Sequence, residues 1–157
     1  PSVPQNFDDV PAEAWYASAV RYVSERGLMS GTAAGTFSPD IPMSRAMIWT
    51  VLAAYNGANT SGGNPWYAPG QKWAMINGVS DGSVPSGSIT RAEVAVIVNH
   101  MLGRTPDQSF VDRSLDRLVS FSDLNSSHWA FYPIMEASNS HDHIKAGGSE
   151  QWTGINN

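Results

Sequence analysis

The 157-residue chain contains no cysteine and only nine lysine and arginine residues. The absence of cysteine excludes disulfides, CxxC redox chemistry and thiolate metal sites. Fourteen acidic residues give a formal net charge of −5, which disfavours nucleic acid and anionic membranes as partners. Any anion that binds this chain must therefore be held by local groups rather than by the overall field.

The sequence also lacks long apolar runs and the motifs of common enzymes. No run approaches the ~18–20 residues that span a bilayer, so we expect no transmembrane segment. There is no GxSxG, HExxH or phosphate-binding loop, and the carboxylates have helix-cap or surface explanations. We therefore expect no enzymatic activity and no cofactor. The chain begins at Pro1 without a start methionine or signal sequence, which indicates a mature or excised fragment.

What the sequence does contain is an internal repeat. Residues 15–31 (WYASAVRYVSERGLMSG) align without a gap on residues 66–82 (WYAPGQKWAMINGVSDG). A second block follows each copy, SRAMIWTVLAAYNG at 44–57 and TRAEVAVIVNHMLG at 90–103. A repeat of roughly 45–50 residues is typical of stacked supersecondary units that cannot bury their apolar faces alone. This pattern favours a repeated binding surface over a single active site.

The spacing of apolar residues and glycines predicts two helices in each full copy. The expected helices cover about 14–25, 44–55, 68–77 and 90–102, with a further short one possible over 113–119. The segment FSDLNSSHW at 121–129 has the same spacing as FDDVPAEAW at 7–15, so a third copy begins. No Ser/Thr-Arg-Ala block follows it, so the third copy does not finish.

We therefore expect one compact, mainly α domain of helix-loop-helix repeats. Its predicted parts are a tail or linker over 1–6, repeat 1 over 7–57, repeat 2 over 58–103, a connector over 104–120, and a partial or diverged repeat 3 over 121–157.

The second helix of each copy begins with a capping residue. Thr90 and Glu93 have the spacing of a capping box, in which each side chain bonds the other residue's amide. In copy one Ser44 keeps the cap, but Met47 replaces the glutamate, so we expect half of the box to be lost there. Capping alone explains these residues without any function.

Capping does not explain the arginine that follows in both copies. Arg45 and Arg91 stand at the first helical position, where the helix dipole disfavours a positive charge. A guanidinium beside free helix amides can hold a carboxylate. An ion pair to an aspartate of a neighbouring repeat explains the arginines equally well. The candidates for that pairing are Asp9, Asp40, Asp81 and Asp123.

Tryptophans occupy both repeated and non-repeated positions. Trp15, Trp66 and Trp129 share one position at a helix start, and we interpret them as core anchors rather than sugar-stacking residues. Trp49 has no aromatic counterpart in copy two and follows Arg45 by one helical turn. It is a candidate for stacking on a sugar, and core packing is the other interpretation.

The only close pair of histidines is His141 and His143. Their i, i+2 spacing does not suit one face of a helix, and no distant cluster in the sequence completes four ligands. We therefore expect no metal site.

The motifs FDDV, GLMSG, TFSPD and MSRA in copy one, and GVSDG and ITRAE in copy two, resemble the S-layer homology domain. The resemblance covers residues 7–103 well and 121–139 in part. It implies a pseudo-threefold helical bundle that anchors exported bacterial proteins by binding secondary cell-wall polysaccharide in grooves between repeats. The ligand in this family often carries a pyruvate-ketal sugar.

The resemblance also implies a site. Because a pyruvate ketal carries a carboxylate, the two repeated arginines match the arginine of the family's motif. The predicted binding residues are Arg45, Arg91, Ser44, Thr90, Trp49 and Asp81. Copy three lacks the arginine block, so at most two grooves are expected to be competent. The expected role is extracellular, non-catalytic anchoring at the cell wall or S-layer; the alternative is a protein–protein interaction module with its arginines in ion pairs between repeats.

Overall fold

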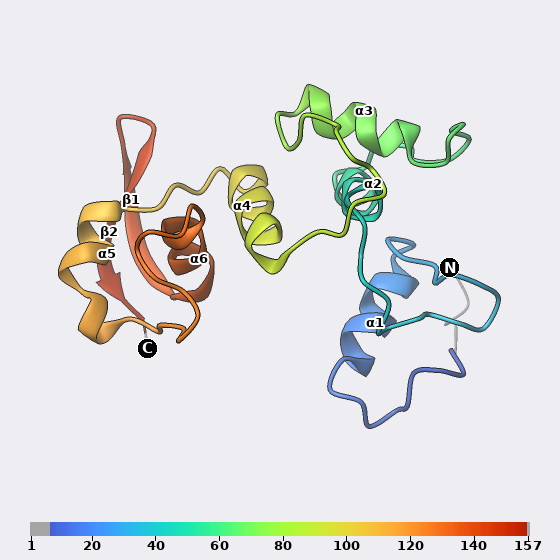
Figure 1. The fold of residues 1–157 in the computed structure, drawn as a ribbon, viewed down its shortest axis with the longest axis horizontal. Helices are drawn as coiled ribbons and strands as arrows, with labels where there is room; N and C mark the ends of the chain where they lie inside the picture. The colour runs from blue at the N-terminus through green and yellow to red at the C-terminus, as the bar shows by residue number, and fades with distance from the viewer. Residues whose placement is uncertain (1–6, 157) are drawn as a thin grey trace. The chain divides into compact units, whose positions relative to one another are not determined.

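The structure is a computed structural model that describes residues 7–156, so the tail predicted over 1–6 lies outside the described residues. Six α-helices, one 3-10 helix and one two-stranded hairpin follow one another along this described part (Figure 1). The mainly α prediction is confirmed. The chain divides into two compact units between Ser88 and Ile89, here called unit 1 and unit 2. This division falls inside the predicted repeat 2, so the two units do not coincide with the predicted repeats. The repeat boundaries remain a prediction.

Unit 1 contains the first three helices. They are α1 (Ala17–Glu25), α2 (Arg45–Tyr55) and α3 (Ala68–Ile76). All three were predicted, although α1 begins about a turn later than the apolar spacing indicated. Most of the buried side chains of this unit come from α2, which packs against α3.

A glycine sets the distance between α2 and α3. Gly70 is buried, and a Cβ there would lie 2.8 Å from the Cα of Thr50. We expect Gly70→Ala to destabilise unit 1 by about 1–3 kcal/mol, because overpacking against a backbone outweighs the ~1 kcal/mol that alanine gains over glycine in a helix. Denaturant unfolding measures the change, with Ser18→Ala on the exposed side of α1 as the control. A variant as stable as the parent would contradict this close crossing.

The loop between α1 and α2 is tied to the segment before α1. Phe7 is buried, and its ring meets that of Phe37 edge-on at 5.1 Å between centroids. The carboxylate of Asp9 accepts hydrogen bonds from the amides of Phe37 (2.9 Å) and Ser38 (2.7 Å). Ser38 has a φ of 62°, uncommon for a residue with a side chain, and the carboxylate stabilises that conformation. Asp9 therefore orders this loop through backbone amides, not through an arginine.

Asp9 makes the stability of this loop depend on pH. The hydrogen bond from the Phe37 amide holds the pKa of Asp9 below its ordinary value of 3.8. A lowered folded-state pKa gives stability that is present above the ordinary pKa and lost as pH falls through the folded one. We expect Asp9→Asn to lower the Tm at neutral pH, since an amide offers one oxygen to two donors.

This Tm difference should shrink at acidic pH, as the pH falls through the lowered pKa of Asp9 and the parent's carboxylate becomes protonated. Thermal unfolding at both pH values checks it, with Asp40→Asn in the same loop as the control. An unchanged difference at both pH values would show that the carboxylate charge does not order the loop.

Unit 2 is built around a different core. Its elements are α4 (Arg91–Met101), α5 (Gln108–Arg113), the 3-10 helix η1 (Leu115–Arg117), α6 (Phe131–Ser138), β1 (His141–Ala146) and β2 (Ser149–Ile155). Helix α4 was predicted, and the short helix expected over 113–119 is present as η1, with α5 just before it. The buried core consists of Val111, Leu118, Phe131, Met135 and Trp152. Helix α6 packs against both α4 and α5. No helix in the described part of the chain is long and apolar enough to cross a membrane.

The hairpin is the element that our prediction missed. Strands β1 and β2 pair antiparallel, and Gly147 and Gly148 connect them with φ angles of 61° and 87°. Two positive φ angles are what a tight two-residue hairpin turn requires. The third copy therefore forms strands after its first helix, where the other two copies have the loop between their helices.

Candidate functional site

The start of α4 is capped as the sequence predicted. The Thr90 hydroxyl oxygen accepts from the Glu93 amide at 3.2 Å, and Glu93 Oε2 accepts from the Thr90 amide at 2.8 Å. The capping box is confirmed. Within residues 7–156, the amides of Arg91 and Ala92 make no hydrogen bond. Two helix-start donors are thus open beside an arginine.

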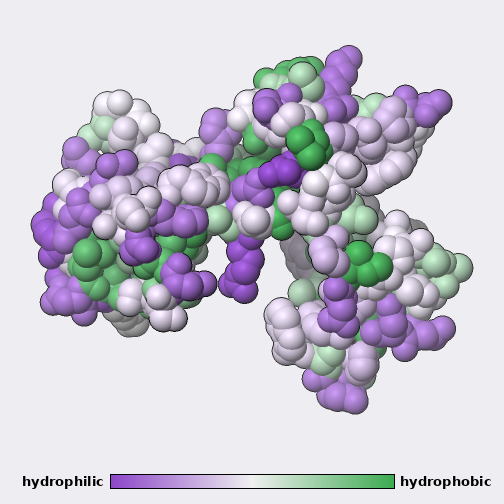
Figure 2. Space-filling model, in the orientation of Figure 1, coloured by the Kyte–Doolittle hydropathy of each residue, from purple (hydrophilic) through white to green (hydrophobic). Residues whose placement is uncertain are grey.

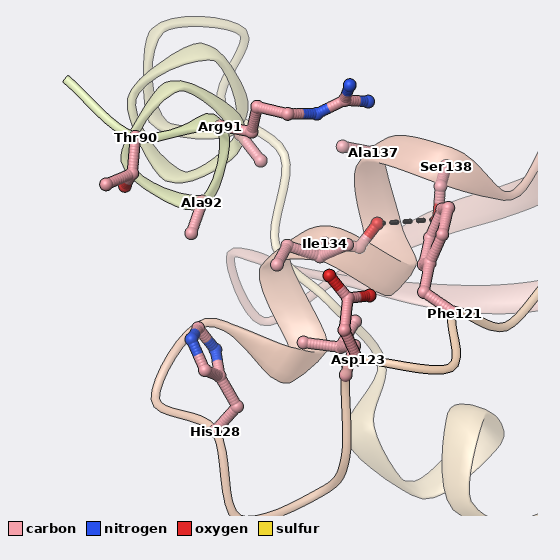
Figure 3. Close-up of a pocket in the computed structure, with 11 residues that line it drawn as sticks. Thr90, Arg91, Ala92, Phe121, Asp123, His128, Ile134, Ala137 and Ser138 are labelled. Atoms are coloured by element: carbon pink, nitrogen blue, oxygen red, sulfur yellow. Dashed lines mark hydrogen bonds between the residues drawn. The ribbon is translucent and has the colours of Figure 1, made fainter.

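These groups line a pocket of about 690 Å³ in unit 2. Figure 3 shows the Arg91 side chain extending from α4 toward Ala137 and Ser138 on α6. Asp123 and His128 face the same space from the turn before α6 (Figure 3). Arg91 is exposed, and its guanidinium makes no ion pair with any residue that the structure describes. The pocket therefore presents an available cation, two available amides and polar groups on its opposite wall.

The start of α2 is closed, in contrast to that of α4. The amide of Arg45 donates to the Gly87 carbonyl and that of Ala46 to the Pro85 carbonyl, both at 2.9 Å. The next amide, of Met47, donates to the Ser44 hydroxyl at 3.2 Å. The first three amides of α2 are thus occupied, and the helix dipole is met by backbone carbonyls rather than by a ligand.

The capping box of α2 corrects one detail of the prediction. The amide of Ser44 donates to the sulfur of Met47 at 3.4 Å, so both halves of the box are present. The hydrogen bond that we expected to be lost is therefore present in a weaker form. A thioether sulfur is a weak acceptor, whereas the glutamate carboxylate at the start of α4 is a strong one.

Arg45 is engaged within unit 1. It is half-buried, and a Cβ placed on Gly87 would lie 2.7 Å from its Nη1. The pKa of Asp81 is lowered chiefly by the Ser83 amide and, to a smaller extent, by the charge of Arg45. Of the two interpretations that the sequence left open for the arginines, Arg45 fits pairing within the protein, while Arg91 fits an open anion site.

The two classes of tryptophan differ in their burial. Trp49 is fully buried on α2, so core packing is its role and its ring has no surface for a sugar. Trp15, Trp66 and Trp129 are 91%, 54% and 64% exposed, so the core-anchor interpretation is wrong. They lie just before the helices, and Trp15 and Trp66 meet the next tyrosine edge-on at 5.5 Å. Figure 2 shows hydrophobic areas (green) that are separated by polar ones on the visible surface.

The pocket also contains residues that the sequence analysis did not assign to a site. Phe121 is 39% exposed and lines the pocket with Asp123 and His128. The signal was available, because Phe121 and Asp123 belong to the third Phe-x-Asp motif, and Asp123 was considered only as an ion-pair partner. The full lining is Thr90, Arg91, Ala92, Ala95, Phe121, Asp123, Leu124, His128, Ile134, Ala137 and Ser138.

A second polar cluster lies behind the hairpin. Glu136 of α6 is fully buried, and its Oε1 lies 2.7 Å from Arg104 Nη2 and 3.3 Å from His141 Nε2. The indole of Trp152 donates to Glu136 Oε2 at 2.9 Å. Burial raises the pKa of Glu136 above its ordinary value, against the opposing charges of His141 and Arg104. This cluster joins α6, the connector and both strands.

We expected no metal site because the spacing of His141 and His143 does not suit a helix, but the structure places both residues on a strand. The segment of His141 and His143 is a strand, and residues two apart on a strand share a face. Glu150 of β2 adds a carboxylate, and one ligand atom from each of the three lies within 4.8 Å of the others.

The described chain is therefore built from helix-loop-helix elements whose second helix begins with a capped arginine. Residues 6–46 match the family model of the S-layer homology domain, which confirms the resemblance seen in the motifs. The chain is 28% identical to an S-layer protein of Bacillus thuringiensis subsp. finitimus over 60% of its own length and 13% of that protein.

Two further relatives come from Acetivibrio thermocellus. The chain is 29% identical to cell surface glycoprotein 1 over 88% of its own length and 7% of that protein. It is also 29% identical to a cellulosome-anchoring protein over 83% of its own length and 32% of that protein. The chain thus corresponds to less than a third of each of these relatives.

Proposed function

We propose that this chain is a cell-surface anchoring module that holds a larger exported protein at the cell wall. The match of residues 6–46 to the S-layer homology domain supports this, as do relatives named as S-layer and cellulosome-anchoring proteins. The comparisons indicate a cell-wall or S-layer associated, extracellular location. The proposed role is structural and non-catalytic.

The proposed ligand is secondary cell-wall polysaccharide, recognised in the unit 2 pocket through a carboxylate such as that of a pyruvate ketal. The observation that carries this proposal is the Arg91 guanidinium beside the open amides of Arg91 and Ala92. A guanidinium fork and helix-start amides together match a carboxylate in charge and hydrogen-bond geometry. Asp123 and His128 offer hydrogen bonds to sugar hydroxyls, and Phe121 offers an aromatic face.

Repeat 1 contributes differently in this proposal. The start of α2 has no open amide, and Arg45 is engaged with its own unit. Of the two grooves allowed by the sequence, the one at α4 carries the wall-binding function. The alternative of a protein–protein module is favoured by the Arg45 environment and by the exposed Trp15 and Trp66, all in unit 1.

Binding to purified wall polysaccharide tests this function. We expect saturable binding by calorimetry to intact polysaccharide and strongly reduced binding after mild acid has removed its ketal-linked pyruvate. Bare peptidoglycan is the control and should not bind. Equal binding to intact and pyruvate-free polysaccharide would refute carboxylate recognition, and no binding to either would favour the protein–protein alternative.

A further inference from the structure

We propose that His141, His143 and Glu150 form a binding site for a divalent transition metal ion of the zinc class. The site lies in unit 2, on the hairpin that follows α6. It is separate from the anchoring pocket, and no residue of the three lines that pocket.

The hairpin brings the three side chains together. His141 and His143 lie two apart on β1, and Glu150 lies on β2, where it is the cross-strand partner of Lys145. A register shift between Asp142 and His143 adds local twist to this end of β1. As a result His141 Nε2 and His143 Nε2 both approach the Glu150 carboxylate.

The separations suit a small tetrahedral ion. Bonds of about 2.1 Å to zinc place two ligand atoms about 3.4 Å apart. His143 Nε2 lies 3.5 Å from Glu150 Oε1, and His141 Nε2 lies 3.9 Å from Glu150 Oε2. All three ligand atoms lie within 4.8 Å of one another, so small side-chain rotations close the site. Three protein ligands leave the fourth position for water, which can enter because the His143 side chain is 36% exposed.

The contacts of the His141 ring fix which of its nitrogen atoms can bind a metal ion. His141 Nδ1 lies 2.8 Å from the carbonyl oxygen of Asn139, which can only accept, so the proton is on Nδ1. In the neutral ring this leaves the Nε2 lone pair facing the proposed site. A ligating histidine typically donates its other ring N–H in this way. Trp152 stacks on the His141 ring at 3.6 Å between centroids and fixes its plane.

A buried carboxylate oxygen has no hydrogen bond to account for its burial. The Glu150 side chain is only 2% exposed, and its Oε2 makes none within the described residues. Such an atom normally costs about 1–3 kcal/mol or more when left unsatisfied. A metal ion at the proposed position would satisfy it.

The charges of the surrounding groups also favour a cation. Glu136 and Glu150 are two buried carboxylates, and Arg104 forms an ion pair with Glu136. Arg104 Nη2 also lies 3.2 Å from His141 Nε2, a contact that the metal would replace. The same Nη2 forms the 2.7 Å ion pair to Glu136 Oε1, and the Arg104 side chain is 31% exposed, so it can shift away from the imidazole while it keeps Glu136 as its partner. Two imidazoles select zinc-class ions over Ca²⁺ and Mg²⁺, which prefer oxygen.

Metal titration of the whole chain tests the site. We expect calorimetry with Zn²⁺ to give one equivalent bound, Co²⁺ to give the visible absorption of a tetrahedral nitrogen-oxygen site, and Ca²⁺ and Mg²⁺ to give neither. Zn²⁺ should also raise the Tm, because an ion that binds only the folded state stabilises it by mass action. Wall-polysaccharide binding should not change.

The variants use the remaining histidines as matched controls. His143→Ala should weaken Zn²⁺ binding by at least about 100-fold, since loss of a ligand costs no less than the 10–100-fold typical of an outer-shell partner. The contacts described for the His143 side chain are with the Glu150 carboxylate and the ring of His141. Because neither contact belongs to the buried core, this variant should fold. His100→Ala and His128→Ala should bind Zn²⁺ like the parent. The proposal would be overturned if the parent bound no stoichiometric Zn²⁺, or if His143→Ala bound Zn²⁺ as tightly as the parent.

Discussion

Arg91→Ala is expected to weaken binding to wall polysaccharide by at least about 30-fold, whereas Arg45→Ala leaves most of the affinity intact. Truncating one partner of a hydrogen-bonded charge pair costs about 2–5 kcal/mol, and the exposure of Arg91 places the loss at the lower end of this range. Calorimetry with purified polysaccharide measures both variants under identical salt. The two arginines occupy equivalent sequence positions, so each is the natural control for the other.

The reason for the difference is the start of each helix. At α4 the ligand carboxylate would meet the guanidinium and two open amides, while at α2 the corresponding amides already bond the carbonyls of Gly87 and Pro85. Arg91→Lys keeps the charge but loses the fork, so its affinity should fall between parent and alanine variant. Since Arg91 makes no described contact, its loss should leave the Tm unchanged.

Two outcomes would count against this assignment. A large loss for Arg45→Ala with none for Arg91→Ala would mean that the binding groove belongs to repeat 1. Unchanged binding in both variants would exclude carboxylate recognition by either repeated arginine, and the anchoring function would then need another surface.

The asymmetry between the two arginines corresponds to the hairpin of the third copy. The start of α2, in repeat 1, is covered by carbonyls of the loop that precedes α4, in repeat 2. The equivalent cover for α4 would come from the corresponding loop of repeat 3. The chain has a hairpin there instead, so the amides of Arg91 and Ala92 are left open.

The helices and caps could be predicted because their causes are local. Apolar spacing and terminal glycines located α2, α3 and α4, and the Thr90–Glu93 pair fixed the capping box. Closure of α2 was not predictable, because carbonyls provided by Pro85 and Gly87 are distant in sequence and carry no side-chain signature.

The hairpin did leave a local signal, and it was misread. Gly147-Gly148 between two short segments containing Ile144 and Trp152 is a hairpin pattern. Testing the spacing of His141 and His143 only against a helix also removed this pair from consideration as ligands. The prediction for the repeated tryptophans was wrong for another reason. Repetition shows that a residue type recurs at a position, but it does not show whether the side chain is buried or exposed.

The largest effect on stability is expected at the buried carboxylate of α6. Glu136 is fully buried, and Arg104 Nη2 lies 2.7 Å from its Oε1. Removing one partner of a buried ion pair costs about 3–5 kcal/mol, because the other charge stays desolvated. Arg104 is 31% exposed and Trp152 still donates to Glu136, so we expect Arg104→Met to destabilise the chain by about 3 kcal/mol. Denaturant unfolding measures this, and Arg113→Met on the exposed side of α5 should change stability by less than about 1 kcal/mol.

The pH dependence separates this charge effect from lost packing. Burial already raises the pKa of Glu136, and losing the Arg104 charge raises that pKa further. A raised folded-state pKa gives stability that is full below the ordinary value and is lost as pH rises through the folded one. The deficit of Arg104→Met should therefore be largest at neutral pH and smaller near about pH 4, where Glu136 is protonated. Glu136→Gln should recover much of it in the double variant, because a neutral amide can still accept from Trp152. A deficit that is independent of pH and not rescued by glutamine would mean that Arg104 acts through its aliphatic stem, and that the buried carboxylate is held by His141 and Trp152 alone.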